Sequence, residues 1–128
     1  PGHYSSARDM ARLARASLGD AHYPLYSQRE FIWNGVRQSN RNPLLGRVPG
    51  VDGLKTGQTR KAGYCLVASA QRAGTRVIAA VLGARSEAAR ARGTARLLDY
   101  GFQAFAGEAL VNQNEAPRTR PIRTGGAR

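Results

Sequence analysis

The stretch "VPGVDGLKTGQTRKAGYCLVASA", residues 48–70, carries the strongest structural signal in the sequence. Its last part, 63–70, is apolar at alternate and at intervening positions, and so is "RVIAAVLGA", residues 76–84. Such runs are typical of strands that are covered on both faces of a sheet. Because only a short connection separates the two runs, we expect them to pair antiparallel. The pattern therefore predicts a buried hairpin that follows directly on Lys55-Thr56-Gly57.

A helix is predicted on each side of this region. Near the N-terminus, Ser6 and Asp9 resemble a capping box, with Asp in place of Glu. Gly19-Asp20 ends this first helix, and Ser86 is a good N-cap for the last one. The apolar stripe of the first helix is Met10, Leu13, Ala14 and Leu18. That of the last helix is Ala91, Ala95, Leu98, Phe102 and Phe105.

Between the first helix and residues 48–70, the chain predicts a short strand, a turn and a loop. Residues 28–33, "QREFIW", read as the strand, and Asn34-Gly35 is a hairpin-type turn dipeptide. Residues 39–50 form a loop rich in Asn, Pro and Gly. The predicted fold class is therefore α/β, an antiparallel sheet covered by helices.

Composition excludes several classes of site. The net charge is +12, and this excess of positive charge favours acidic partners. Only two of the 20 basic residues are lysines. A single cysteine, Cys65, excludes an internal disulfide and a Cys-rich metal site, and His3 and His22 lack metal-ligand spacing. We therefore expect no metal and no cofactor. No run of eighteen apolar residues is present, so none of the sequence reads as a membrane span.

Lys55-Thr56-Gly57 carries groups that suit acyl transfer if it lies on an edge strand beside a cleft. Lys55 supplies a positive charge, and the Thr56 hydroxyl can bind a carboxylate. Gly57 lets a ligand approach the backbone, and the N–H of Gln58 can face a developing oxyanion. A single donor of that kind lowers a barrier by ~3 kcal/mol. Lys-Thr-Gly is also compatible with a turn at the end of a strand, in which the lysine is simply exposed to solvent.

Lys-Thr-Gly is one of three short motifs of β-lactamases and penicillin-binding proteins. Its context here gives it more weight, because a Gly-rich segment precedes it and a buried antiparallel hairpin and an amphipathic helix follow it. Four stretches resemble, in order, the later part of the penicillin-binding domain of a low-molecular-weight D-alanyl-D-alanine carboxypeptidase. The resemblance implies a serine acyl-enzyme mechanism on peptidoglycan peptides ending in D-Ala-D-Ala, with β-lactams acylating the same serine. It also implies a partial β-lactamase/transpeptidase-like fold. The stretches are 2–16, 34–45, 51–70 and 97–102.

The resemblance also implies roles for single residues. Lys55 assists charge stabilisation and proton traffic, Thr56 binds the terminal carboxylate beside Gly57, and Gln58 offers an oxyanion-hole N–H where many relatives have His. Arg41 in "SNRN" and Arg90 in "GARSEAAR" match family arginines near the substrate carboxylate. Arginine suits carboxylates through its forked donors.

The family's nucleophile motif, Ser-x-x-Lys, is absent at all seven serines, and so is Ser-x-Asn. In the family both precede the matched part, and this chain begins without Met, so its N-terminus looks like a cut. We expect the chain alone to be inactive. We also expect the strand 76–84 to expose an unpaired edge, which makes the missing N-terminal part of the domain, or self-association, a partner.

The predicted organisation is a catalytic-domain part at 1–114 and a basic, flexible tail or linker at 115–128. The resemblance implies a location in the periplasm or at the outer face of the cytoplasmic membrane, with membrane attachment only through absent segments and no nucleic-acid partner. Two alternatives stay open. One is a fragment similar to a class A β-lactamase, and the other is a small basic module that binds nucleic acid or an anionic polymer.

Overall fold

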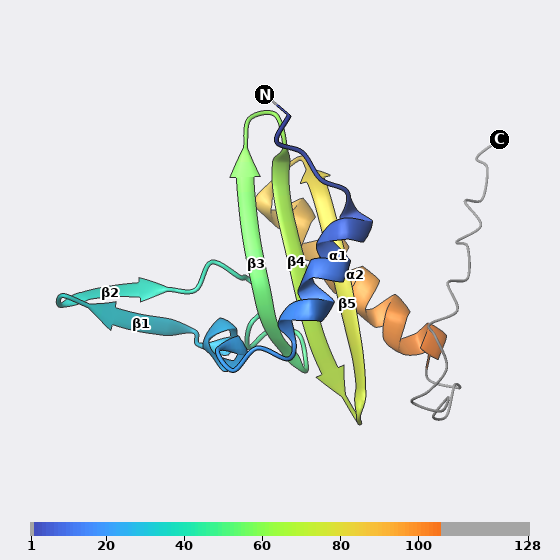
Figure 1. The fold of residues 1–128 in the computed structure, drawn as a ribbon, viewed down its shortest axis with the longest axis horizontal. Helices are drawn as coiled ribbons and strands as arrows, with labels where there is room; N and C mark the ends of the chain where they lie inside the picture. Colours follow the sequence, from blue (N-terminus) through green and yellow to red (C-terminus); the bar gives the residue numbers. More distant parts are fainter. Residues whose placement is uncertain (1, 106–128) are drawn as a thin grey trace.

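The structure is a computed structural model that describes residues 2–105 (Figure 1). It is an α/β fold, as predicted, and the predicted tail at 115–128, with its boundary, lies outside the described residues. The elements in chain order are α1 (Ala7–Ser17), the 3-10 helix η1 (Tyr23–Ser27), β1 (Glu30–Trp33), β2 (Val36–Ser39), β3 (Val51–Thr59), β4 (Gly63–Arg72), β5 (Thr75–Ala84) and α2 (Glu87–Phe105).

The main sheet has three antiparallel strands in the order β3-β4-β5. This confirms the buried hairpin that the apolar runs predict, with β4 and β5 joined through Ala73 and Gly74 at positive φ. Within residues 2–105, no strand pairs with the outer edge of β5. The sheet therefore has two free edges, one on β3 and one on β5.

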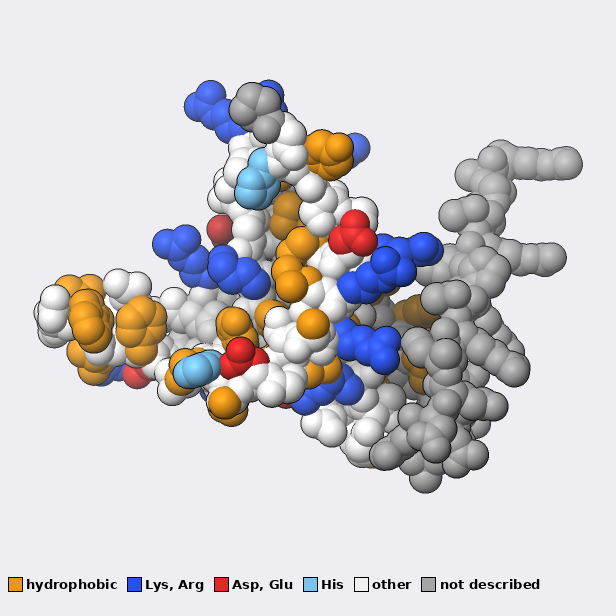
Figure 2. Space-filling model, viewed as in Figure 1, with side chains coloured by type: hydrophobic (Ala, Val, Ile, Leu, Met, Phe, Trp, Pro, Cys, Tyr) orange, Lys and Arg blue, Asp and Glu red, His pale blue; other side chains and the backbone are white. Residues whose placement is uncertain are grey.

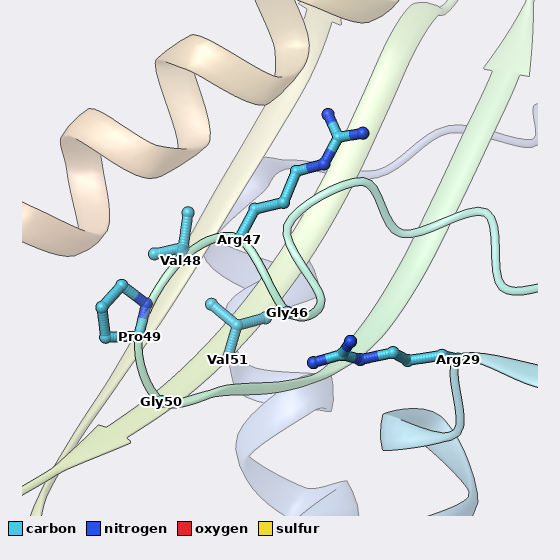
Figure 3. Close-up of a pocket in the computed structure, with 7 residues that line it drawn as sticks. All are labelled: Arg29, Gly46, Arg47, Val48, Pro49, Gly50 and Val51. Atoms are coloured by element: carbon cyan, nitrogen blue, oxygen red, sulfur yellow. The ribbon is translucent and has the colours of Figure 1, made fainter.

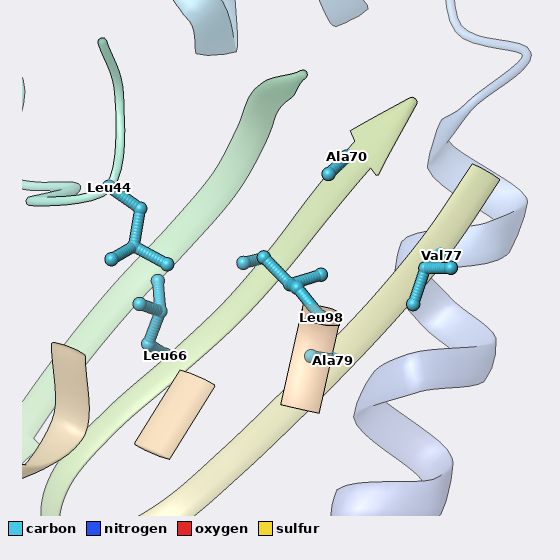
Figure 4. Packing of buried hydrophobic residues seen from close by; sticks show 7 residues of the cluster. Leu44, Leu66, Ala70, Val77, Ala79 and Leu98 are labelled. Atoms are coloured by element: carbon cyan, nitrogen blue, oxygen red, sulfur yellow. The ribbon is translucent and has the colours of Figure 1, made fainter. Parts of the chain in front are cut away.

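The two long helices lie on opposite faces of this sheet (Figure 1). Alternate residues of β4 face them in turn: Val67 faces α1, whereas Leu66 and Ala68 face α2. Leu98 of α2 and Leu66 of β4 are both fully buried in this core (Figure 4). The core on this side consists of Leu44, Leu66, Ala68, Ala70, Val77, Ala79 and Leu98.

The predicted caps are present at both helices. The Ser6 hydroxyl accepts from the Asp9 N–H at 3.1 Å, and the Ser86 hydroxyl accepts from the Ala89 N–H at 3.0 Å. The predicted stripe of α2 is right except at its end, because Phe105 is 52% exposed. No helix among residues 2–105 combines the length and apolar character that a membrane crossing needs.

The hairpin β1–β2 projects away from the sheet (Figure 1). Asn34 and Gly35 both have positive φ, 47° and 75°, which confirms the predicted turn. The strand predicted at 28–33 begins only at Glu30, because η1 and its cap occupy the preceding residues. β1 and β2 are exposed throughout, and their apolar side chains gather at the left of the space-filling view (Figure 2).

Candidate active site at the free edge of β3

The four predicted motif residues lie together on β3, at a free edge of the sheet, which is the condition that acyl-transfer chemistry sets for them. Lys55 pairs with Val67 and Gly57 pairs with Cys65 on β4. Side chains alternate along a strand, so those of Lys55 and Thr56 point to opposite faces. The opposite edge of β3 carries no strand among the described residues, which leaves this side open to a ligand.

Lys55 lies on the α1 face, beside a mostly apolar hollow of about 240 Å³. Its side chain is exposed, and Nζ donates a 2.6 Å hydrogen bond to the carbonyl oxygen of Thr56. Within residues 2–105 no carboxylate pairs with this ammonium. The lysine is therefore an uncompensated cation at the mouth of a hollow. The lining is Met10, Leu13, Ala14, Ser17, Tyr26, Leu54, Lys55 and Val67.

Backbone groups of Thr56 and Gln58 belong to the free edge. The Thr56 carbonyl accepts from Lys55 Nζ. The N–H and C=O of one residue in an antiparallel ladder point to the same side, and residues two apart share that side. The Gln58 N–H is thus directed to the same open edge. The half-buried Thr56 hydroxyl makes no hydrogen bond to another described residue, so it too is available.

Gly57 is not required by packing within the described residues. A Cβ placed there would meet nothing nearer than the Cβ of Cys65, at 4.0 Å, and φ is not in the left-handed region. By contrast, a Cβ at Gly101 would lie 2.6 Å from a Val77 methyl group. The bare backbone at Gly57 therefore leaves open space on the strand that carries the candidate site.

Arg90 of α2 reaches the same strand from the other face of the sheet. Its side chain is buried, with Nη1 3.5 Å from the Gly57 carbonyl oxygen and 3.4 Å from that of Cys65. The guanidinium lies 5.6 Å from the centre of the Tyr64 ring. Nε is buried without a hydrogen-bond partner, and no carboxylate within residues 2–105 pairs with this charge. The structure thus brings Arg90 to the motif.

Arg41 is not brought into contact with the other predicted residues, because its side chain is exposed in the loop after β2. Its neighbour Asn42 is buried and donates from Nδ2 to the Gly53 carbonyl oxygen of β3 at 2.9 Å. Asn42 Oδ1 also accepts from the Leu44 N–H at 3.1 Å. This anchor fixes the backbone beside Arg41 to the start of the candidate strand, and the sequence pattern gave no sign of it.

A second hollow, of about 320 Å³, lies along the loop before β3 (Figure 3). Its arginines, Arg29 and Arg47, point in different directions rather than toward a shared point (Figure 3). None of the predicted site residues lines it. Across residues 2–105, no group of three His, Cys, Asp or Glu residues is arranged to hold a metal. The free edge of β3 is therefore the better candidate for chemistry.

Known proteins resemble the chain over the part that carries this site. The family model for D-alanyl-D-alanine carboxypeptidase matches residues 1–86. D-alanyl-D-alanine carboxypeptidase DacA of Escherichia coli K12 is 49% identical over 107 residues, covering 81% of this chain and 27% of DacA. The chain thus spans about a quarter of that relative.

Solved structures agree with the sequence match. Penicillin-binding protein 6B from Escherichia coli superposes with a TM-score of 0.75 at 45% identity, covering 80% of this chain and 33% of that one. Penicillin-binding protein D2 from Listeria monocytogenes, solved in an ampicillin-bound form, gives 0.65 at 35% identity, covering 70% and 38%. The predicted partial transpeptidase-like fold is confirmed, and the chain belongs to the D-alanyl-D-alanine carboxypeptidase family.

Proposed function

We propose that this chain supplies the substrate-binding side of a serine-type D-alanyl-D-alanine carboxypeptidase that acts on peptidoglycan stem peptides. The observation that carries the proposal is the free edge of β3. There an uncompensated Lys55, an unbonded Thr56 hydroxyl and an open Gly57 stand in sequence, with the buried cation of Arg90 behind them. A peptide ending in D-Ala-D-Ala brings the carboxylate that such a site attracts.

The proposed reaction proceeds through an ester. A serine hydroxyl attacks the carbonyl carbon between the two D-Ala residues, its proton passes to the leaving amine, and free D-Ala departs. Water then attacks the ester, which releases the shortened peptide and restores the serine. No serine of this chain stands in a Ser-x-x-Lys motif, so the nucleophile in this proposal comes from a segment other than these 128 residues.

Each group of the candidate site has a place in that reaction. The ammonium of Lys55 stabilises negative charge and assists proton movement at the serine, while Thr56 and Arg90 bind the terminal carboxylate. The Gln58 N–H donates to the oxyanion that forms when the carbonyl is attacked, a contribution of ~3 kcal/mol. Arg41 reaches the carboxylate from the loop that Asn42 anchors to β3.

β-Lactams belong to the same proposal, because they carry both a reactive carbonyl and a carboxylate. The relative from Listeria monocytogenes was solved with ampicillin and with cefotaxime bound. We place the reaction in the periplasm or at the outer face of the cytoplasmic membrane, where peptidoglycan peptides are found. The membrane itself is not part of the site in this proposal.

A chimera tests the proposed function. In it, the stretch of Escherichia coli DacA that this chain matches is replaced by residues 2–105, so that DacA supplies the rest of the enzyme. We expect release of D-Ala from a pentapeptide ending in D-Ala-D-Ala, and a covalent adduct with a fluorescent penicillin. The isolated 128-residue chain should form no such adduct. A folded chimera without either reaction would contradict the proposal.

The outer edge of β5 is the second part of the proposal, and here the partner is another strand. β5 is ten residues long and apolar, and an unpaired edge of that kind pairs readily with another chain. We propose that it is completed by the remaining part of the same domain, or by a second copy when that part is absent. Light scattering of the 128-residue chain should show association, and a stable monomer would count against this.

A further inference from the structure

The strand that carries the candidate site contains one extra residue. Val51 pairs with Ala70 and Gly53 pairs with Ser69, so Asp52 stands opposite no residue of β4. Such a bulge changes the register of everything that follows it. Because side chains alternate, a slip by one residue would turn Lys55 from the α1 face to the α2 face. The position of the bulge therefore decides where the candidate site points.

Asp52 is held at the bulge by two other elements. Arg76 of β5 donates from both terminal nitrogens to the two carboxylate oxygens, each at 2.9 Å. The Tyr23 hydroxyl of η1 donates to Oδ1 at 3.0 Å. This is the bidentate geometry that makes Arg–carboxylate pairs strong and directional. The side chains of Asp52 and Arg76 are only 32% and 24% exposed, so the pair is partly shielded from water.

The pair connects strands that are not neighbours in the sheet. β4 lies between β3 and β5, and Arg76 also donates to the Ser69 hydroxyl of β4 at 2.8 Å. The guanidinium of this β5 residue thus binds both other strands at the level of the bulge. Gly53 fits this arrangement, since a Cβ there would lie 2.7 Å from the Tyr23 hydroxyl oxygen. A slip of β3 by one residue would break these bonds together.

We propose that Asp52 and Arg76 are positioning residues that fix the register of β3, and thereby the face on which Lys55 is presented. None of their hydrogen bonds within the described residues reaches a predicted site residue. They act by making the bulged pairing more stable than the slipped one. For catalysis the inference rests on the proposed function, but the register itself can be measured without any enzymatic activity.

Position 57 offers a direct probe of the register. A Cβ at Gly57 would lie 4.0 Å from the Cβ of Cys65, within the range of disulfide geometry. Cys65 is the chain's only cysteine, so Gly57→Cys creates a single possible intramolecular disulfide. In a slipped register the two sulfurs would lie on opposite faces of the sheet and could not join. Disulfide formation, counted by alkylation of free thiols and intact mass, therefore reports the pairing.

The experiment compares this disulfide in three backgrounds of the 128-residue chain: Arg76→Met, Asp52→Asn and Arg37→Met. Arg37→Met is the matched control, because it removes an arginine that binds the Glu30 carboxylate at 2.9 and 3.1 Å on the projecting hairpin. We expect oxidation to slow by about tenfold with Arg76→Met and by at least about threefold with Asp52→Asn, since each leaves the other partner unpaired. Arg37→Met should leave the rate unchanged.

Two outcomes overturn the inference. One is an unchanged disulfide rate in both Arg76→Met and Asp52→Asn, and the other is an equal decrease in the Arg37→Met control. If circular dichroism shows that Arg76→Met is unfolded, Asp52→Asn decides the matter alone, because it keeps the size of the side chain. Failure of the proposed function would give a different result. The DacA chimera would then form no penicillin adduct, while the disulfide rates of the 128-residue variants would still differ from one another as expected.

Discussion

The guanidinium of Arg90 lies 3.5 Å from the carbonyl oxygen of Gly57, so α2 places a buried cation directly behind the open segment of β3. That cation has no carboxylate partner within residues 2–105, and its Nε is buried without a hydrogen bond. Burying a charge without full compensation costs stability. Within the described residues, its contacts are the carbonyl oxygens of Gly57 and Cys65 and the Tyr64 ring, so no anion balances the charge there.

Arg90→Met should therefore separate function from stability. In the DacA chimera we expect acylation by penicillin to slow by about tenfold to a hundredfold, because a hydrogen bond to a charged group is worth about 1.5–3 kcal/mol. The free energy of unfolding should change by less than about 1 kcal/mol, since a buried charge is replaced by an apolar side chain of similar volume. Acylation kinetics and urea titration measure the two effects. Arg92→Met, on an exposed position of the same helix, is the control, and equal effects of the two variants would refute the prediction.

Gly57→Ala should leave the fold intact and impair the site. The added Cβ has open space, and the loss of chain freedom in the unfolded state stabilises by about 0.5 kcal/mol. Gly101→Ala forces a Cβ to within 2.6 Å of a Val77 methyl group and should destabilise by about 1–3 kcal/mol. Urea midpoints and penicillin acylation of the chimera distinguish the two variants. Full acylation in Gly57→Ala would show that the open space is not used by the ligand.

The stability of the fold should decline at high pH through Tyr23. Burial raises the pKa of the Tyr23 hydroxyl above its ordinary value near 10, and its hydrogen bond to Asp52 acts in the same direction. The hydrogen bond from Arg76 to Asp52 raises the pKa of Arg76, which stays cationic over this range. The pKa of Tyr23 is higher in the folded state than in the unfolded state, so the protonated hydroxyl stabilises the fold. This contribution to the free energy of unfolding is complete below about pH 10 and is lost as the pH rises through the folded-state pKa. Urea midpoints between about pH 9 and 11 should fall less steeply in Tyr23→Phe than in the parent. Parallel curves would exclude Tyr23 as the cause.

Leu98 should be the most sensitive apolar position of α2. It is 0% exposed within the core cluster between α2 and the sheet, whereas its neighbour Leu97 is 44% exposed. Leu98→Ala should lower the free energy of unfolding by about 2–5 kcal/mol, because it removes buried methyl groups and leaves a cavity. Leu97→Ala should cost less than about 1 kcal/mol. Denaturant titration of both variants checks this, and similar losses would mean that α2 does not pack on the sheet as described.

The sequence predicted the helices, strands and caps that depend on residues close together in the chain. The unbroken apolar runs of β4 and β5 indicate two covered faces, and α1 and α2 supply those covers. Ser6 and Ser86 cap helices through contacts three residues along the chain, which is why a short window suffices to find them. The grouping of Lys55 to Gln58 on one edge strand follows from their being consecutive residues of β3.

The features that the sequence did not predict depend on distant partners. The anchor from Asn42 to Gly53 and the tether from Asp52 to Arg76 join residues far apart in the chain, and neither leaves a periodic pattern. Phe105 continues the apolar stripe of α2, yet its side chain is 52% exposed. The approach of Arg90 to Gly57 likewise depends on how α2 crosses the sheet, so the resemblance pointed to Arg90 whereas the spacing of residues did not.

The two lysines of the chain allow a direct test of whether β3 binds the substrate. Lys55 lies on the free edge of β3 beside the hollow, and Lys61 lies in the turn that follows the same strand. In the DacA chimera, Lys55→Met should slow acylation by fluorescent penicillin by about a hundredfold or more, the scale of losing one charge-stabilising group at a reacting centre. Lys61→Met should acylate at the parent rate. Equal acylation rates for the two variants would contradict the assignment of β3 as the substrate-binding strand.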